Sequence, residues 1–316
     1  MLRTLTIYRI KLILGSSQMN QQRGVPMTKI SAIEGNQQWL DGGSMFGNAP
    51  RAMWERWVEV DSQHRVRLST RSLLIEHGEE RILCETGIGA FFDPKMAERF
   101  GIESTEHLLL QSLKKLDLDH EDITTVILSH LHFDHAGGLL PSYNDIQNGN
   151  NGMLFPNAKL VVGKAHFEHS QKPHFRDRAS YIPDLANKLK DSGRLILVDQ
   201  EKIPGFLEDH LSFFFTSGHT PGQMHTVFKG DETSVVFVGD LIPGTPWVHL
   251  PITMGYDRFP ELLIDEKKKF YEKALPEKWK LFYTHDTECA VSQIALNEKQ
   301  KYYAVACQRE VIRENL

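Results

Sequence analysis

The segment TTVILSHLHFDHAGGLL, residues 124–140, constrains this chain more than any other feature. A short run of β-branched and apolar residues with polar boundaries predicts a buried strand. It leads directly into HLHFDH, which contains His130, His132, Asp134 and His135. Neutral imidazoles and a carboxylate are ligands that Zn²⁺, Mn²⁺, Fe²⁺ and Co²⁺ accept. The segment therefore predicts a site for a divalent metal ion.

The spacing within this motif explains how its four side chains reach one cavity. His130 and His132 are two positions apart, so at the end of an extended strand their side chains leave on the same side. Asp134 and His135 fall where the chain turns into a helix, and they enter the cavity from another angle. A histidine-rich surface turn is the alternative, and the position of the motif at a strand end argues against it.

Three later strands end in further candidate ligands. FFFTSGHTPGQ places His219 after a buried run, SVVFVGD places Asp240, and LFYTHD places His285. Each of these residues alone is better explained as a core or turn residue. Together with the first cluster they make five histidines and two aspartates, enough for two metal ions that share a carboxylate.

The remaining chain alternates strands and helices, which favours one α/β domain of mixed sheets. Strands are predicted at residues 73–76, 81–85, 124–129, 159–163, 194–199, 211–218, 224–230, 233–240 and 280–286. Helices are predicted at 104–116, 164–170 and 260–275, with an irregular helical stretch at 171–193 and a mostly helical segment at 290–312. Residues 142–158 predict a surface loop. We expect a poorly ordered extension at 1–26 and a single domain at 27–316.

Composition limits the partners of this chain. Hydrophobic residues make up 41% and charged residues 24%, as in a soluble globular protein. Lys and Arg number 36 against 41 Asp and Glu, so the net charge of −5 gives no basic surplus for a nucleic acid. No apolar stretch reaches the roughly 18 residues of a membrane span. Cys84, Cys289 and Cys307 are too far apart for a disulfide framework, so a cytoplasmic protein is expected.

The order of these motifs, H-x-H-x-D-H, G-H-T-P-G, a strand-ending aspartate and a late histidine, resembles the metallo-β-lactamase superfamily. The resemblance spans roughly residues 60–290 and implies an αββα four-layer sandwich. In that fold two mixed β-sheets pack face to face, helices lie outside, and two metal ions lie at one edge. We therefore expect two divalent ions in this chain, with zinc first and Mn²⁺, Fe²⁺ or Co²⁺ as alternatives.

The resemblance also implies a role for each candidate residue. The first ion would be held by His130, His132 and His219. The second would be held by Asp134, His135 and His285, and Asp240 would bridge the two. Where the family usually has an aspartate before TG, this chain has Glu85, which is expected to orient a ligand histidine.

Such a site predicts hydrolysis. Two metal ions lower the pKa of a bridging water toward about 7, and the hydroxide attacks a carbonyl carbon or phosphorus. Asp134, beside that water, is expected to accept and return its proton. A small ester or lactone is the leading substrate, and a phosphotriester or aryl ester is the alternative. A non-catalytic metal-binding protein is the alternative from another class.

Three segments, residues 41–57, 179–199 and 249–257, resemble the branch that contains quorum-quenching N-acyl-homoserine lactonases and organophosphate hydrolases. Well-known lactonases of the superfamily have a tyrosine three positions after the bridging aspartate, where this chain has Pro243. The predicted substrate pocket combines an apolar wall with two polar side chains, and its candidates are Met45, Phe46, Trp54, His249 and Tyr256. Core packing is the alternative for the aromatic residues. A thioester of glutathione is disfavoured, because no Arg or Lys cluster accompanies the ligands. A homodimer is left open.

Overall fold

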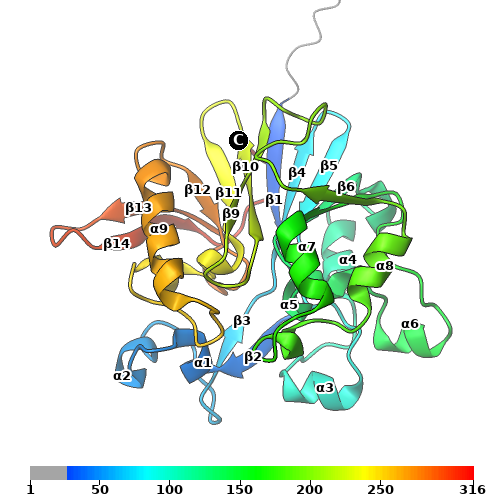
Figure 1. Cartoon of the computed structure of the whole chain (residues 1–316), viewed down its shortest axis with the longest axis horizontal. Coiled ribbons are helices and arrows are strands. Elements are labelled where there is room, and N and C mark those ends of the chain that lie inside the picture. Colours follow the sequence, from blue (N-terminus) through cyan, green and yellow to red (C-terminus); the bar gives the residue numbers. More distant parts are fainter. Residues whose placement is uncertain (1–26) are drawn as a thin grey trace, which may run out of the picture.

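The computed structural model describes residues 27–316, so the extension predicted at 1–26 lies outside the described residues. The described chain forms two mixed sheets and a two-stranded ribbon (Figure 1). The order of the seven-stranded sheet is β15-β1-β4-β5-β6-β7-β8. Its strands are β1 (Thr28–Ile33), β4 (Ser72–His77), β5 (Glu80–Cys84), β6 (Thr125–Leu128), β7 (Lys159–Gly163), β8 (Leu195–Val198) and β15 (Glu314–Asn315).

The second sheet has six strands in the order β14-β13-β12-β11-β10-β9. They are β9 (Leu211–Thr216), β10 (Gln223–Lys229), β11 (Ser234–Phe237), β12 (Lys280–Phe282), β13 (Val291–Leu296) and β14 (Tyr302–Gln308). The ribbon pairs β2 (Gln38–Asp41) with β3 (Arg65–Leu68).

Some helices cover the outer faces of the two sheets, and others lie below the sheets in the view of Figure 1. The helices are α1 (Gly42–Phe46), α2 (Arg51–Trp54), α3 (Pro94–Arg99), α4 (Leu108–Lys114), α5 (Phe133–Ala136), α6 (Tyr143–Gln147), α7 (Lys164–Gln171), α8 (Leu185–Asp191) and α9 (Pro260–Ala274).

Strand β4 shows how sequence alternation creates the layers. Leu73 and Ile75 belong to the same apolar cluster as Phe213 and Phe237, which are residues of the other sheet. Leu74, between them, faces the cluster that includes residues of α4, α7 and α8. The other sheet likewise packs its outer face against α9. Because successive strand residues point to opposite faces, each sheet supplies one side to a shared core and one side to helices.

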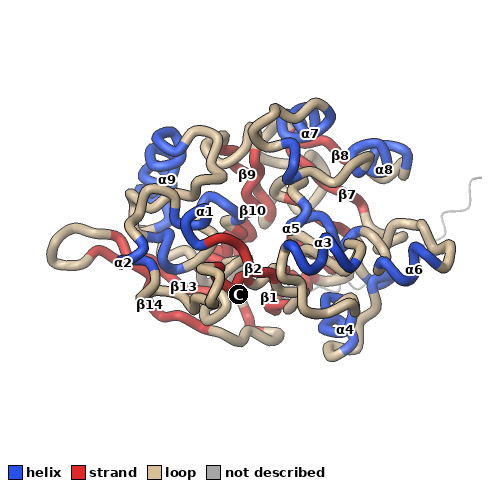
Figure 2. Tube along the Cα trace, turned by 90° about the horizontal axis from the view of Figure 1, so that it is seen from below, coloured by secondary structure: helices blue, strands red, loops and turns tan. Residues whose placement is uncertain are grey.

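The directions of the strands bring the carboxyl ends of several of them to one edge of the sandwich. Strands β5, β6 and β7 are parallel, and so are β11 and β12. Strand β9 is antiparallel to β10, which is antiparallel to β11, so β9 and β11 point the same way. In Figure 2, seen from below the view of Figure 1, helices α1, α3 and α5 lie around β2. The predicted ligands all follow strands that end at this edge.

The segment 290–312 differs from its predicted helix and instead forms the hairpin β13–β14. Strand β13 pairs with β12 through Leu281 and Ser292, which extends the six-stranded sheet. In the turn, the Asn297 side chain accepts the backbone N–H groups of Lys299 and Lys301. Pairing with an existing sheet edge therefore outweighs the local helical pattern. Part of the predicted loop at 142–158 is helix α6, which Ser142 caps.

Within residues 27–316, no helix is both long and apolar enough to cross a membrane.

Candidate metal centre

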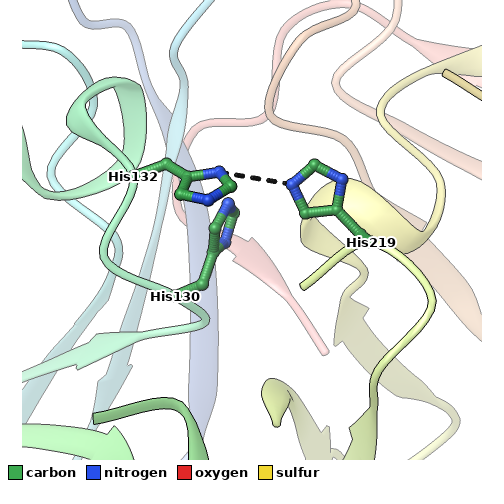
Figure 3. A group of neighbouring side chains, drawn as sticks. All are labelled: His130, His132 and His219. Carbon is green, nitrogen blue, oxygen red and sulfur yellow. Dashed lines mark hydrogen bonds between the residues drawn. The ribbon is translucent and has the colours of Figure 1, made fainter. Parts of the chain in front are cut away.

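The first group of candidate ligands lies directly after strands β6 and β9. His130, His132 and His219 are all buried and offer ring nitrogens within 4.8 Å of one another (Figure 3). The Nδ1 atom of His132 lies 3.3 Å from the Nε2 atom of His219. Two nitrogens bound at about 2.0–2.1 Å to one tetrahedral ion lie about 3.3–3.4 Å apart. The spacing of the two rings therefore matches shared coordination.

The second group of candidate ligands repeats this geometry. Asp134, His135 and His285 are buried and offer atoms within 4.8 Å of one another. The Nε2 atoms of His135 and His285 are 3.3 Å apart. Helix α5 positions the first two residues, and the turn after β12 positions the third.

Asp240 lies between the two groups. Its Oδ2 atom is 3.2 Å from Nε2 of His219, and its Oδ1 atom is 3.2 Å from Nε2 of His285. Within residues 27–316, neither Oδ1 of Asp240 nor Nε2 of His130 makes a hydrogen bond of acceptable geometry. Buried polar atoms without partners are uncommon in proteins. These two atoms therefore fit ligation by ions between the groups.

Burial and neighbouring charges set the protonation of the cluster. Burial and the nearby imidazoles lower the pKa values of His130 and His132 well below normal, which favours the neutral rings that bind metals. For His135, burial opposes the charged ring, but Glu85 and Asp240 outweigh it and raise the pKa. Burial likewise opposes ionisation of Asp240, yet His135 and neighbouring imidazoles hold its pKa well below normal. A bound cation would replace such imidazole protons.

Glu85 contacts both ligand groups. Its Oε2 atom is 2.6 Å from Nδ1 of His135, and its Oε1 atom accepts the hydroxyl of Ser129. The same hydroxyl lies 2.8 Å from Nδ1 of His130. Glu85 has φ of 64°, in the left-handed region that non-glycine residues seldom adopt. This backbone conformation directs a fully buried carboxylate toward the rings.

Two further contacts were not predicted from the sequence. Asp257 accepts from Nδ1 of His219 at 2.8 Å, and its other oxygen accepts the backbone N–H of Met254 at 2.6 Å. Gln38 donates to Oδ2 of Asp134 at 2.7 Å. Asp257 lies in the segment HLPITMGYD, which resembles lactonases and organophosphate hydrolases, whereas no local pattern marks Gln38.

His166 connects the two ligand-bearing turns. Its Nε2 atom accepts the backbone N–H of Leu131 at 2.8 Å, so its proton lies on Nδ1, which faces the carbonyl of Pro221 at 3.1 Å. Leu131 separates two candidate ligands, and Pro221 follows His219 by two residues. Burial lowers the pKa of His166 to about 3, which keeps the ring neutral.

A cavity of about 250 Å³, the metal-side cavity, opens onto the cluster of candidate ligands. Of the predicted pocket residues, Met45 and Tyr256 line it. Phe46 and Trp54 do not, because Phe46 is stacked between Trp54 and Trp247 in the core, with ring centroids 5.4 and 4.6 Å apart. Core packing, the alternative for these two aromatic residues, is what the structure shows.

His249 lies outside this cavity. It follows the short helix Thr245–Val248 and lines a separate hollow with Tyr302 and Tyr303 of β14. The segment 249–257 therefore contributes to the metal-side cavity through its later residues only.

Comparison with known proteins agrees with this geometry. The profile of the Metallo-beta-lactamase superfamily matches residues 65–144 and 154–285. An N-acyl homoserine lactonase from Bacillus sp. is 27% identical over 234 residues, which cover 68% of this chain and 80% of that lactonase. The chain thus belongs to the metallo-β-lactamase superfamily of hydrolases, as its motif order predicted, and its sandwich is the fold of that family.

Solved structures share the fold, and two of them illustrate the likeness. A probable metal-dependent hydrolase from Staphylococcus aureus aligns with a TM-score of 0.77 at 23% identity, covering 90% of this chain and 99% of that one. AidC, described as a dizinc quorum-quenching lactonase, aligns with a TM-score of 0.69 at 22% identity, covering 89% of this chain and 95% of its own.

Proposed function

We propose that this protein is a binuclear metal-dependent hydrolase of small esters or lactones, with N-acyl-homoserine lactones as the leading substrates. The observation that carries the proposal is Asp240, whose two oxygens each face a different group of buried imidazoles. Zinc is the proposed ion for both positions. Its usual bond lengths agree with the 3.3 Å spacing of nitrogens within each group.

Two bound divalent ions would supply Lewis acidity and lower the pKa of water held between them toward about 7. The protein's own contribution centres on Asp134, which we propose as the catalytic carboxylate. Gln38 donates to its Oδ2 atom and fixes the orientation of the group. The Oδ1 atom then accepts the proton of the attacking water and returns it to the leaving oxygen.

The cavity lining supports a partly apolar substrate. Leu40, Met45 and Met254 line it, and these side chains suit an acyl chain. Tyr256 lines the same cavity, and burial raises the pKa of its phenol, which keeps the hydroxyl protonated at neutral pH. We propose that this hydroxyl hydrogen-bonds the substrate, in a chain that has Pro243 where well-known lactonases have tyrosine.

The test is acid release from short- and long-chain N-acyl-homoserine lactones by zinc-loaded protein. His130→Ala serves as the blank, and His64→Ala, a change at an exposed histidine, serves as the matched control. Release that disappears only in His130→Ala supports a lactonase. No release from protein that holds two ions per chain would refute the lactone substrate, and phosphotriesters and aryl esters would then be assayed.

A further inference from the structure

Arg99 is the single lysine or arginine that lines the metal-side cavity in the part of the chain the structure describes. It is the last residue of α3, a helix that carries none of the candidate ligands. No local pattern predicts this position, because α3 and the metal motifs are separated along the chain. Within the described chain, the folded site thus has no cationic cluster, but it has one arginine.

The backbone of Arg99 is held in place beside the metal motif. The ring of Phe100, the next residue, lies 4.6 Å from the ring of Phe133, which belongs to HLHFDH. The carbonyl of Phe100 also accepts the backbone N–H of Trp39 at 2.9 Å. These contacts join α3 to both the ligand turn and strand β2, so the Arg99 side chain starts from a defined point at the cavity.

The guanidinium of Arg99 has no acidic partner among residues 27–316. No carboxylate of the described chain lies within 4.0 Å of it, and none of its five N–H donors makes a hydrogen bond there. Arg65 on the neighbouring ribbon, by contrast, is paired with Asp61 at 2.8 Å. The Arg99 side chain is exposed, and its guanidinium carbon lies 6.0 Å from the centroid of the Phe100 ring. An exposed guanidinium without an acidic partner at the mouth of the cavity is available to an anionic ligand.

Arg99 also lines a second hollow, of about 680 Å³, whose charged lining residues are Arg65, Lys95 and Arg99 against Glu98 and Glu103. Glu103 is engaged by Arg67 and by the indole N–H of Trp39. Arg99 is the one residue that the two linings share. A ligand whose reacting carbon lies at the metal centre and whose far end extends outward would therefore pass Arg99. The planar guanidinium matches a carboxylate through two parallel hydrogen bonds.

We infer that Arg99 binds a carboxylate on the substrate, so that the preferred substrates are esters or lactones carrying a second, anionic group. The inference rests on the proposed hydrolase and names a substrate class for it. It favours anionic esters and lactones over the neutral N-acyl-homoserine lactones, which carry no carboxylate before hydrolysis. It makes Arg99 a specificity residue that distinguishes anionic from neutral substrates of equal length. The metal centre would act on the ester bond while Arg99 holds the far end.

Binding can be measured without turnover. Calorimetric titration of zinc-loaded protein would compare straight-chain monoacids with diacids of the same length, from four to eight carbons. We expect at least one diacid to bind about tenfold more tightly than its monoacid, because hydrogen bonds to charged groups are the stronger ones. Arg99→Gln should abolish that preference while leaving monoacid affinity and zinc content unchanged.

Lys95→Gln is the matched control, because Lys95 lines the outer hollow but not the metal-side cavity. It should keep the diacid preference. A preference absent from the wild-type protein, or equally strong in Arg99→Gln, would overturn the inference. A separate outcome tests the proposed function. If it is wrong, the protein should hydrolyse none of the esters and lactones, even where its preference for diacids depends on Arg99.

Discussion

At the scale of single residues, the orientation of His219 depends on Asp257, 38 positions further along the chain. One oxygen of Asp257 accepts from His219, and the other is held by the backbone of Met254. The hydrogen bond fixes the ring so that its Nε2 atom faces the candidate metal position. Such carboxylate partners make a ligating imidazole more basic and fix its tautomer.

Replacing Asp257 by asparagine should weaken zinc binding about 10- to 100-fold at the position served by His219. The amide keeps the shape of the carboxylate but removes its charge. Competition with a zinc-binding dye measures the affinity of each ion. Asp265→Asn, an exposed change on α9, is the control. Equal affinities in Asp257→Asn and wild type would contradict the role assigned to Asp257.

At the scale of elements, α7 links two turns that come from different sheets. His166 on this helix contacts the backbone after β6 and the backbone after β9. Its replacement by leucine removes both hydrogen bonds, and we expect zinc affinity to fall about tenfold or more. Glutamine carries one donor and one acceptor, so His166→Gln should retain most of the affinity. Equal losses in both variants would indicate a packing role instead.

Helix α9 supports the segment that leads to Tyr256 and Asp257. The buried Lys267 on this helix donates to the carbonyls of His249, Leu250 and Ile252 at 2.9–3.1 Å. Burial lowers its pKa to about 7, partly opposed by Asp257. The side chain therefore loses its proton in the folded protein at a much lower pH than in the unfolded chain, where its pKa is about 10.4.

This difference sets the sign of a pH effect. Between about pH 7 and pH 10 the unfolded chain binds more protons at Lys267, so the free energy of unfolding should rise with pH, by at most about 1.4 kcal/mol per unit. Below pH 7 the contribution should be constant. Denaturant unfolding of wild type and Lys267→Met across this range measures the difference between the two proteins. A difference independent of pH would contradict the lowered pKa.

Local sequence patterns were sufficient to predict most strands and the seven clustered side chains. Each of those side chains follows a short apolar strand, and the carboxyl ends of parallel neighbours meet at one edge. The hairpin at 291–308 was not predicted, because its pairing with β12 is tertiary and outweighs the helical pattern of the segment itself. Three supporting residues were not predicted either. Gln38 and Asp257 contact candidate ligands 96 and 38 positions away, and His166 contacts backbone atoms. No local spacing in the sequence marks such contacts.

At the scale of the whole molecule, the candidate metal centre joins the two sheets. His130 and His132 follow a strand of one sheet, and His219, Asp240 and His285 follow strands of the other. Ions bound there would stabilise only the folded state and not the unfolded chain, because the unfolded chain does not bring these residues together.

Removing the ions should therefore lower the melting temperature. A ligand at about 1,000 times its dissociation constant contributes about 4 kcal/mol, which corresponds to roughly 7 °C for a domain of this size. Scanning calorimetry with and without a chelator measures the shift, and His130→Ala should show a smaller one. An unchanged melting temperature on removal of two ions per chain would contradict a joining role for the centre.

Part of the cavity wall comes from segments of the chain that carry no candidate ligand. Leu40, Met45, Arg99, Ala179 and Met254 line the cavity, yet none of them lies in a turn that carries a candidate ligand. Substitutions at these positions change the shape and charge that a substrate meets while leaving the reactive machinery intact. This division would allow new substrate specificities to evolve. A library of variants at these five positions would change substrate preference without changing the residues that are expected to hold the metal ions.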